Sequence, residues 1–211
     1  MNEEQAVLDF FAQVENLPLG LSVAEQMDEI REGINTHFWR ELQSRLDALI
    51  KTHQLAWLIN PTEDKNAPDS LVGLHCIPNM EQPVYLRPML EQQYLGRVWR
   101  IYFGLMWSTP PSPDQLGLPA VIGLQTSLRN AGFKSNENFL AWQWTTFHPR
   151  RKDFLLRYTQ QREKLLSDVE SIFNALLIEH RLPIMQANAA LRTAQRSLAG
   201  SLNQLRNELI E

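Results

Sequence analysis

The chain has 211 residues, of which 44% are hydrophobic and 21% are charged, and its formal net charge is −4. This composition is that of a folded globular protein and excludes wholesale disorder. The negative balance excludes affinity for nucleic acid or anionic lipid through bulk charge, so any such binding requires a local basic patch.

A single cysteine, Cys76, excludes an internal disulfide framework and is typical of a reducing compartment. The first residues, Met1 to Gln5, are acidic and polar. No apolar run reaches the roughly 18 residues that a membrane-spanning helix needs. We therefore expect a cytoplasmic protein that has no membrane role.

The first fifty residues carry helical patterns. A short helix is predicted from Glu3 to Val14, with Pro18 and Gly20 ending it. Ser22 then stands three residues before Glu25, a capping box that predicts the start of a long helix. The apolar stripe of that helix recurs at steps of three and four residues and consists of Val23, Met27, Ile30, Ile34, Phe38, Leu42, Leu46 and Leu49.

Residues 54–147 change to strand patterns that are rich in aromatic side chains. An apolar run at 55–59 is closed by Asn60-Pro61, and strands are predicted at 71–77, 84–87, 98–107 and 139–147, with a short helix at 119–130. Both faces of the 98–107 strand are largely apolar, which predicts a central strand covered on both sides. In the last strand, Leu140, Trp142 and Trp144 are expected to share one face.

The last third is helical, with one helix at 154–180, a break at Pro183 and a second helix at 184–209. The short break predicts an antiparallel helical hairpin over residues 153–210. We thus expect a single α+β domain over residues 1–211, in which a small, mostly antiparallel, aromatic-rich sheet is flanked by helices at 3–50 and by this hairpin.

The second of these helices carries a leucine stripe that has two readings. The stripe either packs inside the protein or joins a second copy or another chain, and we expect some self-association. Its members are Leu191, Leu198, Leu202, Leu205 and Leu209.

Common catalytic signatures are absent from the sequence: there is no phosphate-binding or dinucleotide-binding glycine motif, no zinc motif and no nucleophile elbow. His75 and Cys76 are neighbours, but adjacent side chains of a strand point to opposite faces and do not form a nucleophile–base pair. We therefore expect no cofactor.

An acidic loop offers the one pattern with metal chemistry. Glu63 and Lys65 form an acidic-x-Lys element, and Asp69 follows. Restriction-type nucleases hold a divalent metal with two acidic residues and orient water with a lysine. Here the elements come in the reverse order within one loop, so a solvated charged loop is the alternative reading.

A basic cluster, Arg150, Arg151 and Lys152, precedes the helix that starts near Phe154. Three cations disfavour a helix N-terminus unless an anion lies nearby. The cluster therefore predicts a site for phosphate, nucleic acid or an acidic partner. The alternative is an exposed loop in which Asp153 caps the helix and water screens the charges.

Several segments together resemble a known group of proteins. The helix segment 34–42 (INTHFWREL), the strand segment 100–105 (RIYFGL), the strand around Trp142 and the long terminal helices are similar to the C-terminal, non-catalytic region of bacterial PD-(D/E)XK-superfamily nuclease proteins. The resemblance implies an α+β module beside DNA-cleaving machinery such as defence systems. The ordered metal-binding carboxylates and lysine of that family have no counterpart here, so we carry over no catalytic residue.

The sequence thus favours a non-catalytic binding or assembly module with a protein partner or self-association, acting as an accessory to nuclease or defence machinery. One alternative is a divergent metal-dependent nuclease that uses Glu63, Lys65 and Asp69 with a divalent metal. Another is a protein–protein adaptor without a nucleic-acid role.

Overall fold

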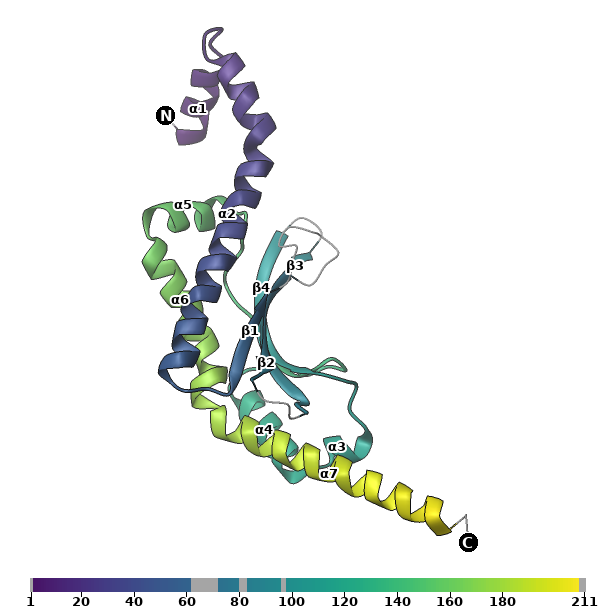
Figure 1. Ribbon diagram of the computed structural model, residues 1–211. Coiled ribbons are helices and arrows are strands. Elements are labelled where there is room, and N and C mark those ends of the chain that lie inside the picture. Colours follow the sequence, from purple (N-terminus) through teal and green to yellow (C-terminus); the bar gives the residue numbers. More distant parts are fainter. Residues whose placement is uncertain (1, 62–71, 80–82, 96–97, 209–211) are drawn as a thin grey trace.

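The computed structural model describes residues 2–61, 72–79, 83–95 and 98–208; for Val72 and residues 196–208 it describes the backbone alone. The predicted α+β class is confirmed within these residues (Figure 1). The elements are α1 (Glu3–Phe11), α2 (Leu17–Thr52), β1 (Trp57–Pro61), β2 (Val72–Pro78), β3 (Leu86–Leu95), β4 (Val98–Trp107), α3 (Pro113–Leu116), α4 (Pro119–Asn130), β5 (Phe139–Trp144), α5 (Lys152–Gln160), α6 (Arg162–Asn174), a π-helical turn η1 (Ala175–Glu179) and α7 (Arg181–Glu208). Among the described helices, none is both long and apolar enough to cross a membrane.

The long helix α2 begins earlier than predicted. Pro18 lies in its first turn, where a missing N–H costs nothing because it would have no partner in any case. Pro18 therefore starts the helix instead of ending one, and the capping box expected at Ser22 was wrong because Ser22 lies inside α2. A side chain at Gly20 would come within 2.8 Å of the Phe11 ring, so this glycine lets α1 fold back closely.

Only the second half of α2 packs into the protein. Phe38, Leu42 and Leu46 of the predicted stripe are fully buried, and so is Trp39, which the stripe did not include. Val23 and Ile30 of the same stripe lie exposed. The reason is visible in Figure 1, where the first half of α2 projects with α1 beyond the sheet and has no surface to cover.

The sheet is an antiparallel meander in the order β1-β2-β3-β4-β5. Its core face supplies the apolar side chains that pack with the helices, among them Leu74, Leu90 and Phe103. A hydrogen bond of 2.9 Å from Trp39 Nε1 to Gln92 Oε1 ties α2 to this face. The second face carries His75, Glu91, Tyr102, Trp142 and Trp144. Its buried apolar residues, Tyr102 and Met89, lie apart from the cluster that packs against the helices.

One strand prediction is confirmed and another needs correction. As predicted, β4 is central and covered on both sides: it lies between β3 and β5, and its residues from Ile101 to Leu105 are buried on both faces, with aromatic side chains of the sheet itself covering the second face. The expected alternation in β5 breaks, because the pairing of β4 with β5 shifts by one residue at Leu105 and Met106. This irregularity places Leu140 in the core and Phe139 beside Tyr102 on the second face.

The C-terminal helices do not form the expected antiparallel hairpin. The predicted 154–180 helix is interrupted at Gln161 and ends in the π-helical turn, and Pro183 lies in the first turn of α7. From there α7 continues away from α6 and packs against α4 (Figure 1). The break between the two helices was predicted. The direction that α7 takes after it depends on contacts with α4 and on Asn188, whose side-chain amide bonds to the β3 backbone at Leu86.

Truncating Phe38 should cost far more stability than truncating Ile30, although both belong to the predicted stripe of α2. The Phe38 ring packs edge-on against Trp39 and Phe154, so Phe38→Ala should lower the free energy of unfolding by about 3–5 kcal/mol. Ile30→Ala should change it by less than about 0.5 kcal/mol, because Ile30 lies exposed. Urea denaturation measures both values. Similar losses would show that the first half of α2 is packed after all.

Candidate functional site

The residues of the predicted metal loop, Glu63, Lys65 and Asp69, lie outside the described residues, and the divalent-metal nuclease alternative stays a prediction. Within the part of the chain that the structure describes, no group of three or more His, Cys, Asp or Glu side chains is placed to hold a metal ion. Cys76 is buried in the core, whereas His75 lies on the second face, as the strand alternation predicted.

The basic cluster is divided by the structure. Arg150, in a left-handed conformation with φ of 75°, pairs with Asp28 at 3.3 Å and Glu32 at 3.8 Å on α2. Its guanidinium also lies 5.7 Å from the centre of the Trp99 ring. Arg151 and Lys152 are exposed at the start of α5, so two of the three predicted cations face solvent and the charge of Arg150 is used to hold α2.

The prediction of a leucine interaction surface on the last helix was wrong for its first residue, Leu191. Leu191 is fully buried in the core, because α7 packs on α4 at this point, and it cannot serve as an interaction surface. Leu198, Leu202 and Leu205 fall on the part of α7 where the backbone alone is described, and Leu209 lies outside the described residues.

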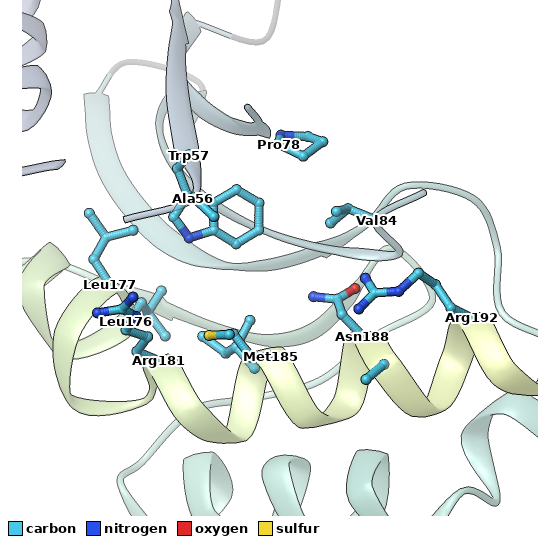
Figure 2. Close-up of a pocket in the computed structure, with 12 residues that line it drawn as sticks. Ala56, Trp57, Pro78, Val84, Leu176, Leu177, Arg181, Met185, Asn188 and Arg192 are labelled. Carbon is cyan, nitrogen blue, oxygen red and sulfur yellow. The ribbon is translucent and has the colours of Figure 1, made fainter. Parts of the chain in front are cut away.

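A first pocket, of about 240 Å³, lies between α7 and the end of the sheet (Figure 2). Trp57, Leu177 and Met185 make it largely apolar, and the π-helical turn that lines it is a form often found at functional sites. Figure 2 shows α7 on one side of the pocket and Trp57, Pro78 and Val84 on the other. We call it the α7 pocket.

Polar side chains around the α7 pocket already bond to the main chain. Asn188 Oδ1 accepts from the Tyr85 and Leu86 amides at 2.9 and 3.0 Å. Arg181 donates to the carbonyl oxygens of residues 53 and 54, and Arg192 donates to that of Pro83. These bonds fix α7 to the sheet, which gives the polar groups of the pocket a structural role.

A second pocket, of about 460 Å³, lies on the second face of the sheet. We call it the aromatic pocket. Its principal lining residues are Glu91, Tyr102, Asn136, Phe139, Trp142 and Trp144. Pockets of this size accommodate small molecules or a single side chain of a partner.

The rings of this pocket stand nearly at right angles to one another. Tyr102 and Trp144 have centres 5.2 Å apart with an interplanar angle of 63°, and Trp142 and Trp144 have centres 5.6 Å apart at 88°. Phe139 meets Tyr102 at 79°. Rings arranged in this way present aromatic faces in several directions instead of one flat stacking surface.

A buried carboxylate lies at the base of the aromatic pocket. The Glu91 side chain is 1% exposed, and its Oε1 lies 2.5 Å from Nε2 of His75. The Tyr102 hydroxyl donates to the other oxygen, Oε2. Burial, together with the neighbouring Glu91 charge, raises the pKa of Tyr102, so this phenol stays protonated and continues to donate.

Two glycines make this geometry fit. Gly73, Glu91, Tyr102 and Trp144 form one row across four strands, and Gly104 pairs with Trp142 in the next row. A side chain at Gly73 would come within 2.8 Å of Glu91 Cγ, and one at Gly104 within 2.9 Å of Trp142 Cβ. Each glycine therefore leaves space for the large neighbour that enters the pocket.

Polar groups surround the rings at the rim. The Asn136 side chain accepts from the amides of residues 138 and 139, which fixes the turn before β5. The Trp142 indole N–H is buried without a hydrogen-bond acceptor among the described residues. Arg100 lies 5.1 Å from the centre of the Trp144 ring, and Lys134 lies 5.8 Å from that of Trp142.

The side chains of the aromatic pocket provide groups that can bind a ligand and no reactive nucleophile among the described lining residues. Both oxygens of Glu91 are held by hydrogen bonds, and the nearest thiol in sequence, Cys76, faces the core. Burial raises the pKa of that thiol, so it stays protonated and unreactive. The aromatic pocket therefore combines an oriented negative charge with apolar walls, which is typical of a recognition site.

Sequence reasoning did not find Glu91. The alternation in β5 placed Trp142 and Trp144 on one face, and that signal was correct. Glu91 lay beyond the predicted end of its strand, which actually runs to Leu95 and places a charged residue in a buried row. The sequence pattern was therefore enough to place Trp142 and Trp144 on one face. Placing Glu91 beside them requires the register of β3, β4 and β5, which the pattern does not give.

Comparison with known proteins gives no relative from which a function could be transferred: no family model, curated protein or solved structure matches the chain. A function for the chain is therefore inferred from the geometry of its pockets.

Adding one methyl group at Gly104 should disturb the pocket, whereas the same change at Gly123 should not. Gly104→Ala should lower the free energy of unfolding by about 1–3 kcal/mol, because the new carbon would meet the β5 backbone and Trp142. Gly123→Ala should raise it by about 0.5–1 kcal/mol, since Gly123 lies in α4 with open space around it. Chemical denaturation gives both values, and a neutral Gly104→Ala would contradict the close approach of β4 and β5.

The phenol of Tyr102 should make stability fall in alkaline solution. Its pKa is raised in the folded protein, while an unfolded chain loses the proton near pH 10. The contribution is therefore complete below about pH 10 and is lost as the pH rises further. In Tyr102→Phe the decline of unfolding free energy above pH 10 should be shallower, by up to about 1.4 kcal/mol per pH unit. Identical slopes for the two proteins would refute this effect of the Glu91 environment.

Proposed function

We propose that this protein is a non-catalytic binding module whose ligand site is the aromatic pocket. The observation that carries the proposal is the buried Glu91 carboxylate, oriented by His75 and Tyr102 beneath the rings of Trp142 and Trp144. Glu91, Trp142 and Trp144 lie outside the apolar cluster that packs between the sheet and the helices. Binding explains why a charge is kept there.

Comparison of the two pockets supports the choice. In the α7 pocket, Arg181, Asn188 and Arg192 bond to the backbone and fix α7 in place. In the aromatic pocket, by contrast, the indole N–H of Trp142 lacks an acceptor among the described residues, and a bound ligand or water would satisfy it. Buried polar groups are rarely left without a partner, which favours the aromatic pocket over the α7 pocket as the occupied site.

A role beside nuclease or defence machinery, suggested by the sequence resemblance, stays a prediction, and so do a protein partner, self-association and nucleic-acid binding through Arg151 and Lys152. The aromatic pocket is compatible with each of them, because a recognition module can serve an assembly by holding one small group of a partner.

A fragment screen tests the proposal directly. A mixture of small cationic, neutral and aromatic compounds is applied to the full chain, and binding is followed by ligand-observed NMR. Fragments that bind the wild-type protein should lose at least tenfold in affinity in Trp144→Ala, because this change removes one wall of the aromatic pocket.

Trp57→Ala is the matched control, since it removes one tryptophan from the α7 pocket instead. The fragments should bind this variant as they bind the wild type. Fragments that lose affinity only in Trp57→Ala, or a complete absence of binding to the wild type, would reject the aromatic pocket as the ligand site. Circular dichroism of both variants confirms that the comparison is between folded proteins.

A further inference from the structure

The charge of the aromatic pocket indicates the class of its ligand. The ion partner that the described residues give Glu91 is His75, and Tyr102 contributes a neutral hydroxyl. A carboxylate has about four acceptor positions, so these two bonds leave part of its capacity unused. Its negative potential attracts cations to the pocket, and solvent screens that attraction only in part because the carboxylate itself is buried. An anionic ligand is disfavoured there and a cationic one is favoured.

The rings act in the same direction as the carboxylate. The face of an aromatic ring is negative, and tryptophan attracts cations most strongly. The near-perpendicular arrangement of Tyr102, Trp142 and Trp144 lets more than one ring face contact the same charged group.

The positions of Arg100 and Lys134 show that these rings already attract cations. Each cation lies over a tryptophan ring, at 5.1 Å for Trp144 and 5.8 Å for Trp142. Neither residue is among those that line the aromatic pocket, so both contacts are made from outside the cavity. The inner space remains for a ligand.

Hydration separates methylated from primary ammonium groups. A primary ammonium is strongly hydrated, and each of its three donors needs an acceptor in the pocket to replace a lost water. A quaternary ammonium has no donor to satisfy and loses less hydration on entering an apolar site. The pocket therefore suits a charge that is covered by methyl groups.

We propose that the aromatic pocket recognises a quaternary or fully methylated ammonium group, held against the rings of Tyr102, Trp142 and Trp144 in the hollow that Glu91 also lines. This inference rests on the proposed function and adds the chemical class of the ligand. Two sources share this chemistry: a free choline-like molecule, and a trimethylated lysine side chain on another protein.

Isothermal titration of the full chain tests the inference with matched probes. Choline is compared with 3,3-dimethylbutan-1-ol, which has the same shape and no charge. Choline should bind at least tenfold more tightly than the neutral alcohol. A short peptide with trimethyllysine, compared with the same peptide carrying unmodified lysine, distinguishes the two sources: a trimethyllysine peptide that binds more tightly than choline identifies a protein partner, and the reverse order identifies a small molecule.

Glu91→Gln gives a second measure, because it removes the charge and keeps the shape. Choline affinity should fall about tenfold, whereas binding of the neutral alcohol should stay unchanged. Equal affinity of the wild type for choline and the alcohol would overturn the inference, and this comparison does not depend on any variant folding. If neutral fragments bind in a Trp144-dependent way while choline and the trimethyllysine peptide do not, the inference fails and the proposed function stands. If no compound binds, the proposed function itself fails.

Discussion

A carboxylate loses its hydration when it is buried, and in this sheet Glu91 recovers part of that loss through His75 and Tyr102. The two partners come from the strands on either side of β3, so the pairing of three strands is needed to hold one charge. This need explains the composition of the row: Gly73 leaves space for the Glu91 side chain, and Tyr102 supplies a hydroxyl that the raised pKa keeps protonated. The second face of the sheet is thus organised around the charge.

The aromatic side chains that cover this face also follow from the burial of the Glu91 carboxylate. A charged residue cannot be packed under a helix with an ordinary apolar stripe, because its remaining acceptor positions would have no partner. Trp142 and Trp144 instead cover the row from the edge strand β5, and Gly104 allows Trp142 to lie close to β4. The result is a face on which half-exposed aromatic side chains surround a hollow above a buried carboxylate.

The parts of the fold that local patterns determine were predictable from the sequence. The helix at 119–130 was predicted with its observed bounds because Pro119 starts it, and the stripe of α2 was correct from Phe38 to Leu46, where the helix meets the sheet. Predictions failed where a neighbour decides the outcome. Pro18 and Pro183 were read as helix breakers, but each lies in the first turn of a helix, and the direction of α7 depends on its contacts with α4 and β3.

The candidate site was predictable only in part, for a related reason. Two tryptophans separated by one residue must share a strand face, and sequence alternation is enough to show it. Glu91 enters the site through register, because it stands opposite Tyr102, and Tyr102 stands opposite Trp144. A shift of one residue in the first pairing would separate the carboxylate from Tyr102, and a shift in the second would turn Trp144 to the core face. Register depends on contacts that are distant in sequence, which a local pattern does not contain.

Two neighbouring residues of β3, Glu91 and Gln92, connect the aromatic pocket with the rest of the protein. These neighbours point to opposite faces of β3, so that one forms the base of the aromatic pocket while the other accepts a hydrogen bond from Trp39 of α2. Trp39 is fully buried and packs against Phe38, in the part of α2 that is fixed to the core. The strand position that carries the carboxylate is therefore tied to the buried part of α2. A site supported in this way is formed before the ligand arrives, and less free energy is lost in ordering it on binding.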